Sequence, residues 1–125
     1  MNAPRRRLLS ALALLVAAPL LPMPARAEPN AAERARIDRL IAFVASQKDC
    51  EFIRNGTAYS AGNAAEFLRG KFDKMGHGVT NAPQFIDKIA TRSSMSGEPY
   101  LMRWSDGRTL PTAQVLHSEL KRMTR

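Results

Sequence analysis

The fold is decided by the stretch Cys50-Glu51-Phe52-Ile53-Arg54-Asn55-Gly56-Thr57-Ala58-Tyr59, near the middle of the 125-residue chain. Asn-Gly between two β-compatible runs predicts a two-residue hairpin turn, because a type I′ turn needs positive φ at both central residues. With that turn, Arg54 pairs with Thr57 and Phe52 pairs with Tyr59. Alternation along the strands then places five side chains on one face: Cys50, Phe52, Arg54, Thr57 and Tyr59.

Helical periodicity flanks the predicted hairpin on both sides. Before it, Asn30 and Glu33 form a capping-box-like pair, and a helix to about Gln47 buries Ile37, Leu40, Ile41 and Val44. After it, a second helix begins at Ser60 or Asn63 and ends at Gly76, which we expect to be a left-handed C-cap. The apolar face of this second helix is Ala64, Ala65, Leu68, Phe72 and Met75.

A third helix and a second hairpin complete the pattern. Thr80 is expected to cap the third helix, with Pro83 in its first turn. A hydroxyl-rich loop over residues 91–97 leads to strands at 100–104 and 108–110, joined by an Asp106-Gly107 turn. A last helix then runs from Pro111 or Thr112 to about Met123. Because isolated hairpins are marginal in water, we expect an α+β fold: both hairpins share one antiparallel sheet packed against three to four helices.

The first 27 residues predict a cleaved signal peptide, which leaves residues 28–125 as a single domain. Arginines at 5–7 precede an apolar run from Leu8 to Leu21, and Ala25-Arg26-Ala27 supplies the small residues of a cleavage site. A transmembrane anchor is the competing interpretation, but prolines interrupt the run, which is shorter than the roughly 20 residues of a span. We therefore expect a periplasmic or secreted protein with no membrane span after cleavage.

Signal cleavage also changes the charge of the chain. The four arginines of residues 1–27 leave with the signal, so fifteen of the nineteen basic residues remain against eleven acidic ones, a net charge of +4. This mild excess and the secretion signal argue against a nucleic-acid partner. An anionic envelope component or an envelope protein is the partner class that fits, although +4 is also ordinary for solubility.

Cys50 is the single cysteine, so the chain has no internal disulfide. Three interpretations stay open: a buried small hydrophobe, a free thiol, or a cysteine that pairs with another molecule. Burial is the commonest state of an unpaired cysteine, and it is the one that we favour.

A family resemblance rests on three strings that occur in this order after the signal: Cys50 to Tyr59 as quoted, Leu68-Arg-Gly-Lys71, and Ser93-Ser-Met-Ser-Gly-Glu-Pro-Tyr100. With them the chain resembles the YfeK-like family of small secreted bacterial proteins, whose function is not established. The likeness covers essentially the whole predicted mature chain. It implies a location in the envelope of a Gram-negative bacterium, and it implies no reaction.

Candidate binding residues gather in the same strings. Arg54 and Tyr59 share a hairpin face, and the following helix is expected to bring Arg69 or Lys71 back towards them. A guanidinium group binds a carboxylate or phosphate through two parallel hydrogen bonds. The predicted ligand-binding residues are Arg54, Asn55, Tyr59, Arg69, Lys71, Ser94 and Ser96. In the competing interpretation Arg54 bonds backbone carbonyls or Glu51, Tyr59 fills the core, and Asn55 serves the turn alone.

The leading functional hypothesis is a non-enzymatic binding or interaction module of the cell envelope. The alternative is an enzyme that acts on an envelope substrate, with Cys50 or a loop serine as nucleophile. His77 and His117 are the two histidines, and the spacing of neither ties it to Cys50. Without a phosphate-binding glycine motif or a cluster of metal ligands, we assign no catalytic residue and expect no cofactor and no metal.

Overall fold

The computed structural model describes residues 27–124, so the predicted signal peptide lies outside the described residues apart from Ala27. In chain order the elements are α2 (Ala31–Ser46), β1 (Cys50–Arg54), β2 (Thr57–Tyr59), α3 (Ala61–Met75), α4 (Ala82–Lys88), β3 (Leu101–Trp104), β4 (Thr109–Pro111) and α5 (Thr112–Met123). This order confirms the predicted α+β pattern. Within the described range, none of the helices has the length and the apolar character to cross a membrane.

The two hairpins share one antiparallel sheet, as predicted. Its strand order is β2-β1-β3-β4, so β1 and β3 lie side by side in the centre. The first hairpin has the predicted register, with Arg54 opposite Thr57, and its turn has φ of 51° at Asn55 and 79° at Gly56. The short turn explains this agreement, because two residues with positive φ leave one way to join the strands.

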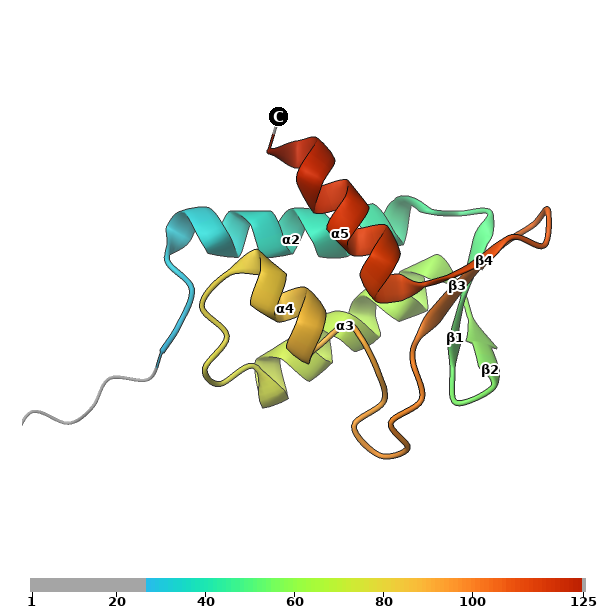
Figure 1. Cartoon of the computed structure of the whole chain (residues 1–125), viewed down its shortest axis with the longest axis horizontal. Helices are drawn as coiled ribbons and strands as arrows, with labels where there is room; N and C mark the ends of the chain where they lie inside the picture. Colours follow the sequence, from blue (N-terminus) through green and yellow to red (C-terminus); the bar gives the residue numbers. More distant parts are fainter. Residues whose placement is uncertain (1–26, 125) are drawn as a thin grey trace, which may run out of the picture.

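The helices gather on one side of the molecule and the sheet stands at the other end (Figure 1). One sheet face packs against the helices, where Phe52 and Met102 lie opposite each other and are almost fully buried. Cys50 belongs to the same core and is 5% exposed, in agreement with the favoured interpretation. The helices complete the core with apolar side chains from their inner faces, among them Ile37, Leu40, Val44, Leu68, Phe85, Ile86 and Leu116.

The left-handed C-cap predicted at Gly76 is wrong. Gly76 ends α3 with φ of −82°, and positive φ occurs instead at Gly78. Gly76 is nevertheless restricted to glycine for another reason: an added Cβ would lie 2.4 Å from the backbone oxygen of Phe72. The absence of a Cβ therefore lets residue 76 lie close to Phe72 at the C-terminal end of α3. The backbone conformation of Gly76 itself is ordinary.

Two predictions about helix starts are wrong: the residue that caps α4 and the capping box of α2. Asn81, not Thr80, caps α4, because its side chain accepts a hydrogen bond from the backbone N–H of Gln84. Asn30 caps α2 as predicted, by accepting from the backbone N–H of Glu33. Glu33 does not complete a capping box, since its carboxylate accepts from the backbone N–H of Ala82 at the start of α4. Glu33, which was predicted to cap its own helix, thus links α2 to the start of α4.

Candidate anion-binding pocket

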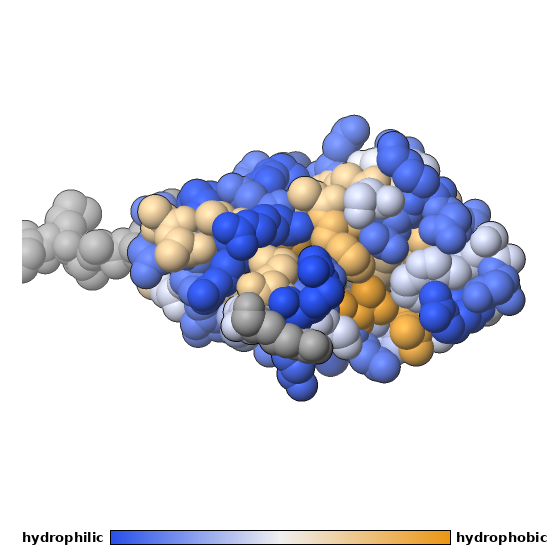
Figure 2. Space-filling view, turned by 90° about the horizontal axis from the view of Figure 1, so that it is seen from above, coloured by the Kyte–Doolittle hydropathy of each residue, from blue (hydrophilic) through white to orange (hydrophobic). Residues whose placement is uncertain are grey.

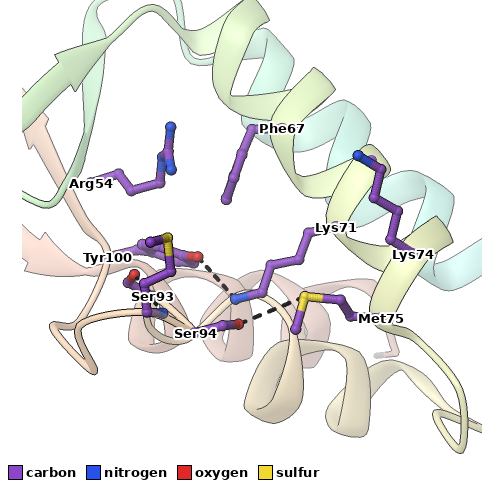
Figure 3. A pocket seen from close by; sticks show the side chains of 10 residues that line it. Arg54, Phe67, Lys71, Lys74, Met75, Ser93, Ser94 and Tyr100 are labelled. Carbon is purple, nitrogen blue, oxygen red and sulfur yellow. Dashed lines mark hydrogen bonds between the residues drawn. The ribbon is translucent and has the colours of Figure 1, made fainter.

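A cavity of about 310 Å³ opens between the end of the first hairpin, one face of α3 and the hydroxyl-rich loop of residues 91–97 (Figure 3). We call this segment the serine-rich loop. We call this cavity the Arg54 pocket. Its lining residues come from three parts of the chain that are distant in sequence: Arg54, Phe67, Gly70, Lys71, Lys74, Met75, Ser93, Ser94, Met95 and Tyr100.

Arg54 reaches the pocket from the last position of β1. Its guanidinium carbon lies 4.3 Å from the centre of the Phe67 ring and 5.0 Å from that of Tyr59, and one N–H donates to the Tyr59 hydroxyl at 3.1 Å. Among residues 27–124 this guanidinium makes no ion pair, and Glu51 bonds Arg103 instead. Two aromatic rings therefore hold a cation in place while most of its five N–H donors stay available.

Lys71 enters the pocket from α3 and is only 7% exposed. Its Nζ atom donates to the backbone oxygen of Arg92 at 2.8 Å. It also donates to the Tyr100 hydroxyl at 2.9 Å (Figure 3). No carboxylate of the described chain pairs with this amine. Burial lowers the pKa of Lys71, and the positive charge of Arg54 lowers it further. The site thus contains a buried amine whose charge nothing acidic compensates.

The turn of the first hairpin is fastened to the serine-rich loop by side-chain hydrogen bonds. Asn55 donates to the Ser93 hydroxyl at 3.3 Å and accepts from the Ser96 hydroxyl at 2.5 Å. The Ser93 oxygen also accepts from the backbone N–H groups of Met95 and Ser96. Asn55 therefore does more than form its turn, because it positions one wall of the pocket.

Of the two basic residues predicted to fold back from α3, Lys71 lines the pocket and Arg69 does not. Arg69 pairs with Asp38 of α2 at 2.8 Å. Residues two apart on a helix point to nearly opposite sides, so these two cannot share one face. Tyr59 lies against Arg54 but lines a neighbouring cavity. Ser94 lines the pocket and donates to the Met75 sulfur at 3.8 Å, whereas Ser96 contributes only through Asn55.

Several lining residues escaped the sequence prediction although the sequence carries a signal for them. Phe67, Gly70, Lys74 and Met75 were not predicted. Together with the predicted Lys71 they follow the spacing i, i+3, i+4, i+7, i+8, which is one face of α3. Met75 was expected to be buried on the apolar face of this helix, but it is 52% exposed. Met95 is 93% exposed. Both methionine side chains therefore give the pocket an apolar border.

The charge of the pocket is one-sided. Three basic residues line it, Arg54, Lys71 and Lys74, and its lining includes neither aspartate nor glutamate. Apolar groups from Phe67, Met75 and Met95 form much of the remaining surface. Such a surface favours a ligand with an anionic group and an apolar body, because each part then meets a complementary part of the wall.

The residues of the alternative, nucleophilic hypothesis lie apart or are engaged elsewhere. Cys50 belongs to a different cavity, and burial, with the nearby charge of Asp49, raises the pKa of its thiol, which disfavours the thiolate. His117 of α5 pairs with Asp87 of α4 at 2.7 Å. Neither Ser93 nor Ser94 is hydrogen-bonded to Lys71 in the described part of the chain. No group of three metal-binding side chains occurs there either.

Comparison with known proteins matches residues 31–124 to a family described as a family of unknown function, DUF5329. A protein of Salmonella typhimurium, "Uncharacterized protein YfeK", is 44% identical over 85 residues, which cover 68% of this chain and 71% of that protein. The resemblance inferred from the hairpin and its companion strings is thereby confirmed. No solved structure matches the chain.

Proposed function

We propose, for a chain that belongs to the DUF5329 family of unknown function, that the Arg54 pocket binds a small amphipathic anion in the cell envelope. The ligand would carry a carboxylate or phosphate group on a short apolar body. The protein would act as a binding module and not as an enzyme. The observation that carries this proposal is the set of three basic lining residues, Arg54, Lys74 and the buried Lys71, without an acidic residue in the lining.

The stacked guanidinium of Arg54 is the predicted anchor of the anionic group. Its central carbon lies over two aromatic rings and one N–H donates to the Tyr59 hydroxyl, so the remaining N–H donors are the part left to a ligand. Two parallel hydrogen bonds to one carboxylate or phosphate suit these donors. Because the rings restrict the side chain before binding, little conformational entropy is lost when the anion arrives.

The apolar body of the ligand would lie against Phe67 and the two exposed methionines. Unbranched thioether side chains adapt to different shapes, so this border suits a class of related ligands better than a single one. The cavity of about 310 Å³ is at the lower end of the range for small-molecule sites. Short acyl or aromatic acids and their phosphate counterparts match these dimensions.

Hexanoate and hexanamide provide a direct test, because they share shape and differ in charge. Titrations followed by NMR should show shifts in α3 and the serine-rich loop with hexanoate, and binding at least tenfold weaker with hexanamide. Arg54→Gln should weaken hexanoate binding about tenfold or more, since a hydrogen bond to a charged group contributes about 1.5–3 kcal/mol. Hexyl phosphate in place of hexanoate would show which headgroup the pocket prefers.

Arg69→Gln is the matched control, because it removes the same charge from the same molecule outside the pocket. Its affinity for hexanoate should equal that of the parent. Equal binding of hexanoate and hexanamide, or equal loss in Arg54→Gln and Arg69→Gln, would contradict the proposed site.

The envelope location is supported by the predicted signal peptide of residues 1–27. An anionic envelope component is the corresponding partner class. Mass spectrometry of the protein from a periplasmic extract should find Glu28 as its first residue. Recovery of the chain with residues 1–27 intact from the cytosolic fraction would contradict this assignment.

A further inference from the structure

Lys71 has a geometry that simple anion binding does not use. Besides its bond to carbon, a tetrahedral amine nitrogen has three further directions, and each holds a hydrogen atom or a lone pair. Two of them point to fixed oxygen atoms, the Arg92 carbonyl at 2.8 Å and the Tyr100 hydroxyl at 2.9 Å. The third direction has no partner among the described residues. When the amine is neutral, that third direction holds the lone pair, in a residue that lines the cavity.

We infer that Lys71 is a nucleophilic amine that captures an aldehyde or ketone group of a ligand in the Arg54 pocket as an imine. This inference deepens the proposed function and rests on it for one element, the docking of the anionic group of that ligand near Arg54. The ligand class is thereby narrowed to small amphipathic anions that also carry a reactive carbonyl.

The neutral form that the reaction needs is favoured by the surroundings of the amine. Lys71 is buried beside the Arg54 cation and has no acidic partner in the described chain, so both effects oppose its protonation. Lys74, on the next turn of α3, lines the same cavity but is exposed. The two lysines therefore line one pocket but differ in burial, and burial favours the neutral, nucleophilic form of an amine.

The condensation needs no oxidant, reductant or further reactant. The Lys71 lone pair forms a bond to the carbonyl carbon, and the carbonyl π electrons move to the oxygen. Nitrogen loses a proton and oxygen gains one, which gives a carbinolamine. The hydroxyl then takes up a proton from water and leaves as water while the nitrogen lone pair forms the C=N bond. The iminium ion so formed returns its remaining N–H proton to water, so the net change is amine plus carbonyl to imine plus water. Tyr100, whose hydroxyl lies 2.9 Å from Nζ, is placed to carry a proton between nitrogen and oxygen.

Reductive trapping tests this inference on the parent protein. The purified protein is incubated with 4-carboxybenzaldehyde and cyanoborohydride, digested, and mapped by mass spectrometry. We expect Lys71 to carry at least about tenfold more adduct than Lys74, although Lys71 is the less exposed, and benzoate to reduce its labelling. Labelling of Lys74 or the other exposed lysines with Lys71 unmodified would overturn the inference.

Two variants test the assignment of the adduct to Lys71. Lys88→Arg, at an exposed position of α4 outside the pocket, should keep the Lys71 adduct, and Lys71→Arg, which lacks a nucleophilic amine, should lose it. If Lys71→Arg fails to fold, the peptide map of the parent still decides. The hexanoate titration separates the two proposals: hexanoate binding without a Lys71 adduct overturns the covalent step alone, whereas absence of hexanoate binding overturns the anion pocket.

Discussion

Both hairpins place an arginine on an aromatic ring, but the cavities beside them differ in charge. In the first hairpin Arg54 lies over Phe67 and Tyr59. In the second hairpin Arg108 lies 4.6 Å from the centre of the Trp104 ring. This second arginine borders a cavity of about 370 Å³, which we call the Trp104 groove, lined by Phe43, Trp104, Arg108, Leu110, Gln114, Val115, Ser118, Glu119 and Arg122.

The Trp104 groove contains its own counter-charge. Glu119 accepts two hydrogen bonds from Arg122, at 2.9 and 2.5 Å, within α5. The face over α2 and α5 correspondingly shows hydrophobic surface interspersed with hydrophilic groups (Figure 2). The comparison teaches that an arginine stacked on a ring does not by itself make an anion site. What distinguishes the Arg54 pocket is cationic charge that no lining residue neutralises.

The largest expected difference between the hairpins concerns stability. Phe52 is 2% exposed and its ring centre lies 5.2 Å from that of Tyr100. Phe52→Ala should therefore lower the free energy of unfolding by about 3–5 kcal/mol. Trp104→Ala should lower it by only about 1–2 kcal/mol, because the indole is half-buried. Urea denaturation measures both, and equal losses would show that the two hairpins contribute equally to the core.

A single acidic residue should make the Arg54 pocket resemble the Trp104 groove. Met95 is almost fully exposed at the pocket border. Met95→Glu places a carboxylate there that competes for the cations and repels a bound anion, so hexanoate affinity should fall about two- to fivefold, as expected for an exposed charge. Met95→Gln is the control of similar shape and should bind nearly as the parent does. An unchanged affinity in Met95→Glu would mean that charge imbalance is not the decisive property.

The two turns offer a subtler comparison. Gly56 and Gly107 both have positive φ, 79° and 91°, so replacing either by Ala should cost about 1 kcal/mol of unfolding free energy. Only Gly56→Ala should also weaken hexanoate binding, by about twofold, because its neighbour Asn55 holds the serine-rich loop. Denaturation and titration of the same samples check both statements. A binding loss in Gly107→Ala of the same size would contradict the special role of the first turn.

The smallest expected effect is a dependence of stability on pH that arises from Lys71. Its pKa is lowered in the folded protein from an ordinary value of 10.5, so the unfolded chain binds more protons as the pH approaches that value. The free energy of unfolding should therefore rise with pH in this range, relative to Lys71→Met. Measurements should stay below pH 10, because the raised pKa of Tyr100 acts in the opposite direction above its ordinary value of 10.0.

Lys74→Met provides the reference for this measurement. It removes an exposed amine from the same pocket, so it controls for the loss of a lysine side chain at this site. A Lys71→Met curve parallel to the Lys74→Met curve would show that burial of Lys71 has no consequence for proton binding.

Local features of the fold could be predicted because short stretches of chain determine them. Asn55-Gly56 determines the register of the first hairpin, since a two-residue turn leaves no alternative pairing. The contact between β1 and β3 joins residues about fifty apart, such as Glu51 and Arg103, and no local pattern specifies that register. Thr80 and Asn81 are both good capping residues, so packing decided between them.

The candidate site could be predicted only in part for the same reason. Arg54 and Lys71 were found because their residue types suit anions. Arg69 was included although helical geometry already separates it from Lys71. Tyr100 and Met95 were missed as residues that line the pocket, because the loop that carries them meets α3 only through the tertiary fold. The stripe from Phe67 to Met75 was available in the sequence and would have identified one wall.

Gly70 sits within that stripe, and a Cβ added there would meet no atom within 4 Å. Gly70 is thus the one residue of the stripe without a side chain, and there is empty space beside it in the Arg54 pocket. Ala, Val or Leu at this position would fill the cavity in graded steps without displacing a neighbour at the first step. For the anion-binding function that we propose, the side chain at position 70 would then set the length of the ligand that fits, which makes Gly70 the position at which to change selectivity.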